Sequence, residues 1–486
     1  MCLFDGFNEE NIRKIFGHEA AEDESIDRLK EYYLKTDAYN TLKSNIPFYL
    51  LVGHKGIGKS ALLKVLEMED IQSNNIAITI RPDDIVGIGN HENNFLNRIS
   101  VWKKGLTNII MDKMYSFLKS HYMKKIGAPE ILINMIGGFL KDKFDEFSII
   151  TENFSKVLMD DFLKNRKICI YIDDLDRGWK NTSEDIENLS ALLNAIRDLN
   201  RTFASIKFRI GLRSDVYYSV RTSDETTDKI DGSVIWLRWT NHEIFVMLIK
   251  RINTFFKKEK NENILLSMNQ KKLDVYLNEL FEDTFKGVGL WSEVGMHKVL
   301  MSMIRRRPRD LVKLCTLAAR KAAERGHKKI MTNDLKEIFS QYSQDRLLDT
   351  CNEYSSELKN IRELLLSMKP TRNEIEKGKP CIFKRAELIK KIQNIQQNIR
   401  IIFTGQSFIA DAQDVAAFLY KINFLTARKD TKDNIQRLYY DENRYIYNEF
   451  SDFGYDFEIH PAYRWALQPD TLDDLFKSIQ ISIDSE

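Results

Sequence analysis

The sequence predicts an α/β protein with a mainly parallel sheet, followed by a long helical region and a small C-terminal domain. Short apolar runs alternate with helical periodicity over residues 46–240, which is the pattern of βαβ units. From 241 to 366 the pattern is helical almost throughout. Proline (8) and glycine (21) are scarce among the 486 residues, which permits long helices and argues against an all-β fold with many turns.

The predicted sheet lies within a core domain at 46–240, preceded by a charged N-terminal helical segment at 1–45. Short, largely apolar runs fit strands that are covered on both faces. The long interval between the second and third runs has helical periodicity and exceeds what a crossover needs, so we expect a helical insertion at about 90–150. The candidate strands are residues 47–52, 75–80, 168–172, 208–212 and 234–237.

The C-terminal half is expected to contain two further domains. Residues 241–366 are predicted to form a helical lid, and residues 367–486 a winged-helix-like domain that ends in an acidic tail after Pro469. The boundary is a linker at 368–380, which holds two of the eight prolines.

The winged-helix prediction depends on helices followed by a hairpin. One helix is expected near 383–398 and a second at 411–425, with Asp411 as its N-cap. The hairpin is expected at 437–450, turning at Asp441-Glu442-Asn443.

Composition excludes several classes of protein. With 43% hydrophobic and 30% charged residues, the chain can bury a large core, unlike a disordered chain. Lys+Arg (73) and Asp+Glu (71) nearly balance, so a nucleic-acid contact would need a local patch. Five cysteines without C-x-x-C, and no H-E-x-x-H, argue against a disulfide framework or a zinc hydrolase. We see neither a signal peptide nor an apolar run of about 20 residues, so we expect a cytoplasmic protein without membrane contact.

Residues 53–60, GHKGIGKS, have the spacing G-x-x-x-x-G-K-[ST] between a predicted strand and a predicted helix. Glycines let the backbone curl so that successive N–H groups, and the dipole of the following helix, face phosphate oxygens. Lys59 would bring positive charge to the β- and γ-phosphates, and Ser60 would place its hydroxyl on Mg²⁺. The alternative is a chance match in a glycine-containing loop. The predicted nucleotide-binding residues are Gly53, His54, Lys55, Gly56, Ile57, Gly58, Lys59, Ser60 and Ala61.

A second apolar strand, residues 168–172, ends in carboxylates, which a Mg²⁺–nucleotide site needs beside its phosphate loop. We expect Asp173 to hold the metal and Asp174 to orient or deprotonate the attacking water. Asp176 and Arg177 could support either role. The alternative is a strand that simply ends in solvated acids.

Two arginines are further candidates. Arg213 follows the strand at 208–212, where ligands of parallel sheets sit, and could contact the γ-phosphate. It could equally form a structural pair with Asp215 or with one of the carboxylates after 168–172. Arg309 opens a helix in the lid and could be brought to the nucleotide.

Residues 301–330 hold ten Lys and Arg against two acids. They could serve a neighbouring subunit or a nucleic-acid backbone, or form a solvated basic helix face.

The chain resembles bacterial P-loop ATPases of the STAND and KAP type within the AAA+ group. GHKGIGKS, IDDLDR and GLRSD look like Walker A, Walker B (in its KAP-like form) and sensor 1, and RRPRDLVKL looks like the sensor-2 helix of initiator-type lids. Residues 16–24, 237–252 and 457–467 resemble a little-studied bacterial group with a winged-helix end. The resemblance implies ATP rather than GTP, and many relatives of this type lie in anti-phage systems. Asp174 stands where most AAA+ proteins have Glu, which suits the slow hydrolysis of a switch.

The helix at 411–425 could read duplex DNA together with a wing at 441–444. Its apolar residues share one face, and Lys421 is its only base, with Arg428 and Lys429 just beyond. A reading helix usually carries more Arg, Asn or Gln, so packing or protein contact is the favoured alternative.

Together these patterns predict a P-loop NTPase that binds ATP and Mg²⁺, hydrolyses ATP slowly, and controls assembly of a homo-oligomer or a separate effector. A DNA-binding initiator or loader is one alternative, and a nucleotide-bound scaffold with little hydrolysis is another.

Overall fold

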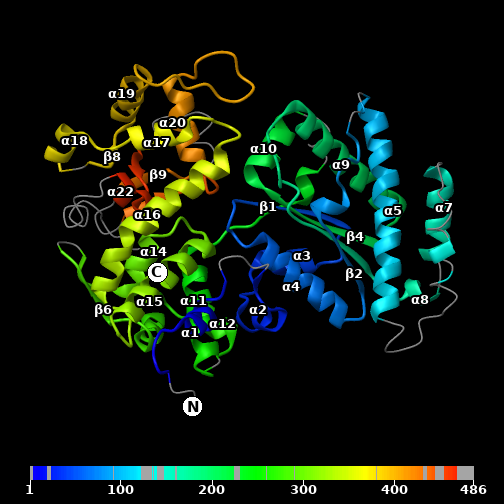
Figure 1. Ribbon diagram of the computed structural model, residues 1–486, viewed down its shortest axis with the longest axis horizontal. Coiled ribbons are helices and arrows are strands. Elements are labelled where there is room, and N and C mark those ends of the chain that lie inside the picture. The colour runs from blue at the N-terminus through cyan, green and yellow to red at the C-terminus, as the bar shows by residue number, and fades with distance from the viewer. Residues whose placement is uncertain are drawn as a thin grey trace. The chain divides into compact units, whose positions relative to one another are not determined.

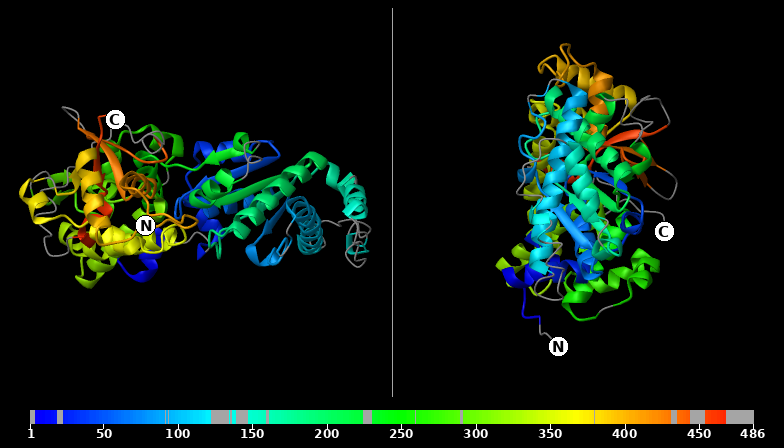
Figure 2. Two further views of the ribbon diagram at one scale, coloured as in Figure 1. Left: turned by 90° about the horizontal axis from the view of Figure 1, so that it is seen from above. Right: turned by 90° about the vertical axis from the view of Figure 1, so that its right-hand side faces the viewer.

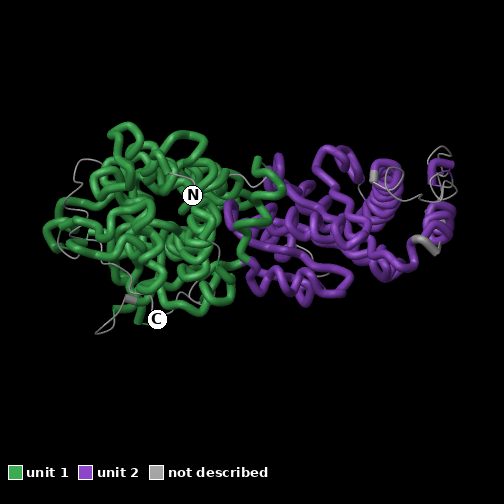
Figure 3. Tube along the Cα trace, turned by 90° about the horizontal axis from the view of Figure 1, so that it is seen from below, with its two compact units in different colours: residues 1–34, 238–486 green, residues 35–237 purple. Residues whose placement is uncertain are grey.

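The computed structural model divides the chain into two units: unit 1, Met1–Leu34 with Arg238–Glu486, and unit 2, Lys35–Leu237 (Figure 3). The predicted boundaries at residues 45, 240 and 366 are not tested by this division and stay predictions. The structure describes residues 4–18, 23–90, 92, 94–121, 134, 136–138, 147–158, 161–223, 230–258, 260–288, 291–378, 380–430, 435–443 and 454–467.

Unit 2 is built on a five-stranded sheet with the order β2-β3-β4-β1-β5, in which every neighbouring pair is parallel (Figure 1). All five predicted strands are present. The strands are β1 (Phe48–Gly53), β2 (Ile76–Ile80), β3 (Ile168–Ile172), β4 (Ile206–Arg213) and β5 (Val234–Trp236). The helices are α3 (Asp37–Lys43), α4 (Lys59–Gln72), α5 (Phe95–His121), α7 (Phe147–Leu158), α8 (Asp161–Lys164), α9 (Ser183–Thr202) and α10 (Ser214–Ser223), with short 3-10 turns at Pro82–Asp84 and Asp231–Ser233.

The helical insertion predicted at about 90–150 coincides, where it is described, with α5 and the start of α7 (Figure 2). The rest of that interval, apart from residues 90, 92, 94, 134 and 136–138, lies outside the described residues. Helix α5 packs against β2 and α9, so part of the insertion contributes to the core of unit 2.

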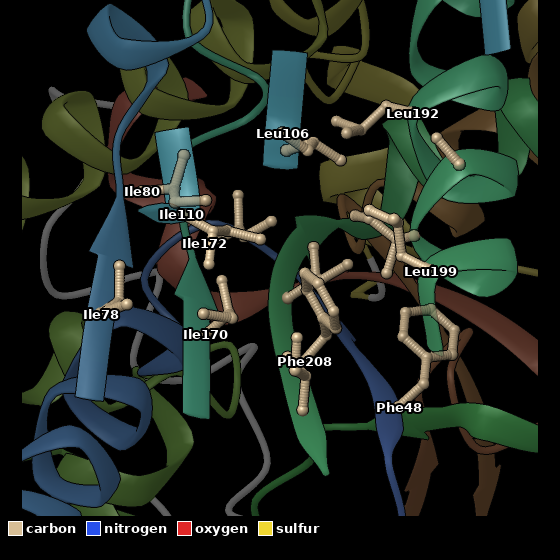
Figure 4. Packing of buried hydrophobic residues seen from close by; sticks show 14 of the residues in the cluster. Phe48, Ile78, Ile80, Leu106, Ile110, Ile170, Ile172, Leu192, Leu199 and Phe208 are labelled. Atoms are coloured by element: carbon tan, nitrogen blue, oxygen red, sulfur yellow. The ribbon is translucent and has the colours of Figure 1, made fainter. Parts of the chain in front are cut away.

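One face of the parallel sheet is apolar. Branched and aromatic side chains of the strands pack there against α5 and α9, which removes a large apolar area from water (Figure 4). Members of this cluster include Phe48, Ile78, Ile80, Ile170, Ile172, Phe208, Leu106, Ile110, Leu192 and Leu199.

The other face of the sheet packs against α4 and is polar at both ends. Side chains alternate along a strand, so Tyr171 and Asp173 of β3 and its extension share a face with Arg209 and Gly211 of β4, as the pairing register requires. Asp173 and Gly211 lie at the carboxyl ends of the strands, and Tyr171 and Arg209 lie nearer the amino ends. This face therefore holds two separate polar regions, one at each end of α4.

Unit 1 is mainly helical and carries two small antiparallel sheets, ordered β10-β9-β11-β8 and β6-β7. Its helices are α1 (Glu9–Phe16), α2 (Ile26–Tyr32), α11 (Asn241–Phe255), α12 (Glu262–Ser267), α13 (Gln270–Asp274), α14 (Met296–Ser302), α15 (Pro308–Glu324), α16 (Thr332–Tyr354), α17 (Ile361–Ser367), α18 (Arg372–Glu376), α19 (Arg385–Gln396), α20 (Ala412–Lys421) and α22 (Pro461–Leu467), with a 3-10 turn at Val275–Glu279. Its strands are β6 (Thr284–Lys286), β7 (Ser292–Gly295), β8 (Ile382–Phe383), β9 (Leu425–Asp430), β10 (Ile435–Leu438) and β11 (Asp456–Ile459).

The C-terminal part of unit 1 differs from the prediction in two places. Asp411 is the N-cap of α20, as predicted, but the helix ends at Lys421 because Asn423 takes a left-handed conformation (φ 57°), and Leu425 already belongs to β9. Strands β9 and β10 form an antiparallel pair that was not predicted, and the hairpin predicted at 437–450 stays a prediction. Asp441 and Glu442 do form a turn, but residues 444–450, the expected second arm, lie outside the described residues, as does the acidic tail after Pro469.

Among the described residues, no helix combines the length and the apolar character that crossing a membrane requires.

Candidate nucleotide-binding site

The phosphate loop connects β1 to α4. Strand β1 ends at Gly53 and α4 begins at Lys59, so the loop lies at the carboxyl edge of the sheet and at the N-terminus of a 14-residue helix. Gly56 (φ 78°) and Gly58 (φ 103°) have the positive φ that residues with a Cβ rarely adopt. At Gly53 a Cβ would stand 2.9 Å from Ile57 Cγ2. The loop therefore has the backbone shape that the glycine spacing predicts.

Lys59 lies within this loop. Its Nζ donates to the carbonyl oxygens of Gly53 at 2.9 Å and His54 at 3.3 Å. Both acceptors are neutral, so the ammonium charge has backbone partners inside the loop that phosphate oxygens could replace, with a gain from the charge-assisted hydrogen bond. Lys55 is exposed on the same loop, Ile57 is buried, and Ala61 is half-buried in the first turn of α4.

His54 is only 5% exposed, and its Nδ1 lies 3.1 Å from Ser214 Oγ, at the start of α10. The motif predicted a backbone role for His54; the structure adds a side-chain contact between the phosphate loop and the end of β4. The sequence holds no signal for this contact because the two residues are 160 positions apart.

Asp173 and Ser60 meet at the candidate metal position. Burial raises the pKa of Asp173 to about 6; the hydrogen bond with Ser60 and the charge of Lys59 oppose this rise, and the negative charge of Asp174 adds to it. A Cβ on Gly211 would stand 2.5 Å from Asp173 Oδ1, so only glycine leaves room for the carboxylate there. A half-buried carboxylate bonded to a hydroxyl is a hard oxygen pair of the kind Mg²⁺ prefers, and a cation would relieve the cost of ionising Asp173.

Asp174 is exposed and has φ 59°, a left-handed conformation that Asp tolerates better than most residues. Its carbonyl oxygen accepts a hydrogen bond from Arg177 N at 2.9 Å, which closes a turn directly after β3. This turn holds the Asp174 side chain in the solvent at the edge of the sheet, where a water could reach it.

Arg213 forms the structural pair that was one of its two predicted roles. It donates to both carboxylate oxygens of Asp215, at 3.0 and 2.5 Å, and its Nη1 lies 3.4 Å from Asp176 Oδ2. The pairing register places Arg213 beside Gly53, at the start of the phosphate loop. Arg213 is therefore adjacent to the loop, and a contact with a γ-phosphate stays a prediction.

The arginine cluster of unit 1 is mostly buried and paired. Arg305 binds Asp310 through two hydrogen bonds, at 2.8 and 2.9 Å, and Arg346 binds the same carboxylate at 2.6 Å. Arg307 lies 2.7 Å from Glu353. Arg309, the predicted lid residue, is half-buried in the first turn of α15, and its role at the nucleotide stays a prediction.

Most other bases of residues 301–330 also face carboxylates within unit 1. Arg306 pairs with Glu442, Lys313 with Asp345, Arg320 with Glu9, Lys321 with Glu324 and Glu337, and Arg325 with Asp334 and Glu337. These ion pairs favour a basic helix face whose charges are neutralised within unit 1, and they leave little positive charge to bind a nucleic-acid backbone.

Helix α20 offers little surface for reading DNA. From Ala412 to Tyr420 only Gln413 and Asp414 are exposed, and the N-cap Asp411 is exposed as well. Lys421 pairs with Glu357 at 2.8 Å, and Arg428 is buried against Glu458. These contacts favour a packing role for α20.

Two of the three segments that carry the resemblance to a bacterial group meet within unit 1. Arg251 of α11 donates to the carbonyl of Phe16 and lies over the Tyr32 ring at 4.3 Å. Gly17 approaches so closely that a Cβ would stand 3.0 Å from Arg251 Nη1. The third segment is also part of the packed core, since Tyr463 OH receives a hydrogen bond from Arg305 at 3.0 Å. These segments act as scaffold.

Comparisons with known proteins agree with the core. Residues 14–224 match the family model described as ORC-CDC6-like, and residues 242–351 match a FunZ-associated C-terminal helical domain. The chain is 22% identical over 524 residues to a putative transposon gamma-delta 80.3 kDa protein of Escherichia coli (strain K12), an alignment that covers 97% of this chain and 70% of that protein.

Among solved structures, the ORC2 protein of Aeropyrum pernix in ADPNP–ADP complexes covers 93% of each chain at 11% identity, with a TM-score of 0.41. A Walker-type ATPase of Pyrococcus abyssi covers 78% of this chain and 93% of its own at 12% identity, with a TM-score of 0.35. Likeness at this level carries no functional inference. The sheet, the loop and the family match together show that the protein has a parallel-sheet α/β P-loop ATPase core resembling ORC-CDC6-like proteins, followed by a helical region.

Proposed function

We propose that the protein is a cytoplasmic ATP- and Mg²⁺-dependent switch that hydrolyses ATP slowly and controls either its own assembly or a separate effector. The observation that carries the proposal is the convergence of Lys59, Ser60 and Asp173 at the N-terminus of α4. The ORC-CDC6-like match over residues 14–224, a range that includes these three side chains, supports the same assignment.

Each loop residue has a proposed task when nucleotide binds. Lys59 exchanges the carbonyls of Gly53 and His54 for β- and γ-phosphate oxygens. Ser60 and Asp173 hold Mg²⁺, which supplies charge stabilisation to the transferring phosphoryl group. Asp174, exposed at the same edge, orients or deprotonates water; it is one methylene shorter than Glu, which fits slow turnover.

Arg213 is the proposed sensor. Its partners Asp215 and Asp176 are carboxylates at the same edge of the sheet as the loop, so a γ-phosphate would compete with them for the guanidinium. Exchange of partners would alter the start of α10, which the His54–Ser214 contact links to the loop. Arg309 is proposed to report nucleotide from the lid, as the resemblance to initiator-type ATPases implies.

The test is ATP hydrolysis by wild type, Lys59→Ala and Asp174→Ala, each with and without duplex DNA, with the molecular mass measured in parallel. Lys328→Ala, an exposed lysine of unit 1, is the matched control. We expect turnover by wild type and the control, and loss in both site variants. A different outcome would favour the nucleotide-bound scaffold: wild type does not hydrolyse ATP, yet ATP changes its molecular mass, and Lys59→Ala abolishes that change. This outcome would remove the catalytic role of Asp174.

A DNA-binding initiator or loader is the second candidate, favoured by the ORC-CDC6-like match. The burial of α20 and the ion pairs of 301–330 weigh against it. Duplex affinity that falls steeply with salt would support the loader.

For the biological setting we propose anti-phage defence, on the resemblance to STAND and KAP ATPases alone. Loss of protection against phage in cells carrying Lys59→Ala, at equal protein level, would support this setting, whereas equal phage sensitivity with and without the wild-type gene would remove it.

A further inference from the structure

Unit 2 contains a second polar cavity, of about 200 Å³, at the amino-terminal edge of the parallel sheet. It lies under the last turns of α3 and α4, on the same face of the sheet as the phosphate loop but at the other end of α4. Lys207 and Arg209 of β4 and Tyr171 of β3 line it from the sheet, and Asp70 lines it from α4.

Two buried cations in this cavity have only neutral acceptors. Lys207 is 8% exposed and donates to the Ser44 carbonyl at 3.1 Å and to Asn45 Oδ1 at 2.8 Å. Arg209 is 3% exposed and donates to the carbonyls of Leu42, Ser44 and Phe208 at 2.7, 2.9 and 2.9 Å. Buried Lys and Arg are rarely found without a carboxylate partner, because an uncompensated buried charge is costly.

Hydrogen-bonding capacity remains at both cations. An ammonium has three N–H donors and a guanidinium five, so one donor of Lys207 and two of Arg209 have no acceptor among the described residues. Exposed Lys167 adds a third cation, since its Nζ donates to the same Asn45 Oδ1 at 2.8 Å. Burial lowers the pKa of Lys207, and the charges of Lys167 and Arg209 add to this effect. An anion would relieve this mutual repulsion.

Two carboxylates line the cavity, and the hydrogen bonds of both go to groups other than Lys207, Arg209 and Lys167. Glu69 accepts from Lys35 at 2.9 Å and Lys43 at 2.6 Å, and Asp70 accepts from Tyr171 OH at 2.5 Å and Asn75 Nδ2 at 2.9 Å. The competing explanation is that Lys207 and Arg209 only hold the carbonyls at the end of α3, which a cation favours. That explanation accounts for their existing bonds but leaves the unused donors and the empty volume without a role.

We propose that this cavity binds a phosphate group, held by Lys207, Arg209 and Lys167. At about 30 Å³ per water, the cavity has room for roughly six waters, enough for a phosphate with part of its hydration shell. The three cations match a doubly charged oxyanion. A bound anion would stabilise the connection between α3 and β1, because Ser44 and Asn45 of that connection already accept hydrogen bonds from Lys207 and Lys167.

The test measures binding of inorganic phosphate, against chloride at equal ionic strength, by calorimetry on full-length Lys59→Ala, so that the phosphate loop contributes little. A second arm uses glycerol 3-phosphate to distinguish free phosphate from a phosphomonoester. Adding Lys207→Met should weaken binding about tenfold, the value of one charge-assisted hydrogen bond, and adding exposed Lys167→Gln about threefold. Lys328→Gln in the same background should leave binding unchanged.

Hydrogen exchange of residues 42–49 serves as a readout that needs no cavity variant. We expect phosphate or the monoester to slow exchange there in Lys59→Ala. The proposal is overturned if neither compound binds or slows this exchange, or if a folded Lys167→Gln/Lys59→Ala protein binds both as tightly as its parent.

Discussion

Arginine–carboxylate pairs occur in both units, but they differ in burial and in the number of bonds already made. In unit 1, Arg305, Arg346 and Asp310 are at most 3% exposed at their side chains, and the Asp310 carboxylate accepts from both arginines. In unit 2, Arg213 lies beside the phosphate loop and is 15% exposed; its partner Asp176 is 17% exposed and its partner Asp215 is 3% exposed.

This difference in burial distinguishes arginines that only stabilise the fold from an arginine that could change its partner when nucleotide binds. A fully buried cluster cannot exchange a partner, since removal of one charge leaves the other without solvent. A pair at the edge of a sheet, beside a site for anions, can exchange one acceptor for another at low cost. Motifs marked both regions, because GLRSD contains Arg213 and RRPRDLVKL contains Asp310 and directly follows Arg305. The burial of each pair and the number of hydrogen bonds already made distinguish the two regions.

The largest expected effect is in unit 1. Buried Glu458 accepts from Arg428, Arg437 and Arg464, and Arg428 also binds Asp430. Glu458→Gln removes the buried anion that the three guanidiniums share and should lower the free energy of unfolding by about 3–5 kcal/mol. Urea unfolding measures this loss. Asp345→Asn, which removes a half-exposed partner of Lys313, is the control and should cost less than about 1 kcal/mol. Equal losses in the two variants would contradict the comparison.

Next in size is Arg213. If it exchanges partners, Arg213→Ala should lower the rate of hydrolysis about 100-fold while the affinity for Mg²⁺–ATP changes by less than threefold. Asp215→Asn, which weakens the resting pair, should keep hydrolysis. The contrary result is an Arg213→Ala protein that is destabilised as much as Glu458→Gln but hydrolyses ATP at the wild-type rate per folded molecule. That result would show that Arg213 only stabilises the fold.

The two regions should respond to pH in opposite directions. Burial raises the pKa of Asp173 to about 6, so the folded state binds the extra proton and stability falls as pH rises from about 4 to 6. Burial alone would raise the pKa of Glu458, but Arg437 and Arg464 lower it below its usual range, so that stabilisation is lost as pH falls below about 4.5.

The Asp173 titration should also appear in binding. Mg²⁺–ATP affinity should fall about tenfold per pH unit below 6, because a protonated carboxyl is a poor metal ligand. Calorimetry at pH 5 and 7 measures this change. Asp173→Asn corrects for protonation of ATP itself and should lack the additional dependence; parallel pH profiles in the two proteins would remove Asp173 from the metal site.

The smallest effect should come from the surface of α15. Arg320 pairs with Glu9 at 2.7 Å, with both side chains about half exposed, so Arg320→Gln should change the free energy of unfolding by less than about 1 kcal/mol. It should leave duplex DNA retention in a filter assay unchanged at every salt concentration. A smaller salt slope in the variant would show that Arg320 contacts DNA phosphates and would reopen the loader.

Local patterns predicted the strands of the parallel sheet and the backbone shape of the loop at residues 53–60. Glycine spacing defines the phosphate loop, and apolar runs of four to six residues marked all five strands, because both signals arise from neighbours in sequence. The alternation Lys207, Phe208, Arg209 at the start of β4 was missed, since the predicted strand began at 208 and was read as apolar. The alternation of basic and apolar side chains at these three positions was the sequence signal for the cavity that Lys207 and Arg209 line.

Other features depend on contacts that no local pattern encodes. Arg305 has partners on α15, on α16 and at Tyr463, 158 residues away, so its burial could not be read from a basic run. The β9–β10 pair was not predicted, because the tyrosines around 439–447 gave a stronger β signal than Leu425–Asp430, and Asn423 alone marked the end of α20.

The most direct test of the central claim is equilibrium binding of Mg²⁺–ATP to wild type and Lys59→Ala, with Lys328→Ala as control and urea unfolding on each protein. The account predicts that Lys59→Ala weakens binding at least tenfold with unchanged stability, because the ammonium would contact the phosphates, whereas its bonds to Gly53 and His54 are to neutral backbone carbonyls. Equal affinity in wild type and Lys59→Ala would contradict the assignment of residues 53–60 as the nucleotide site.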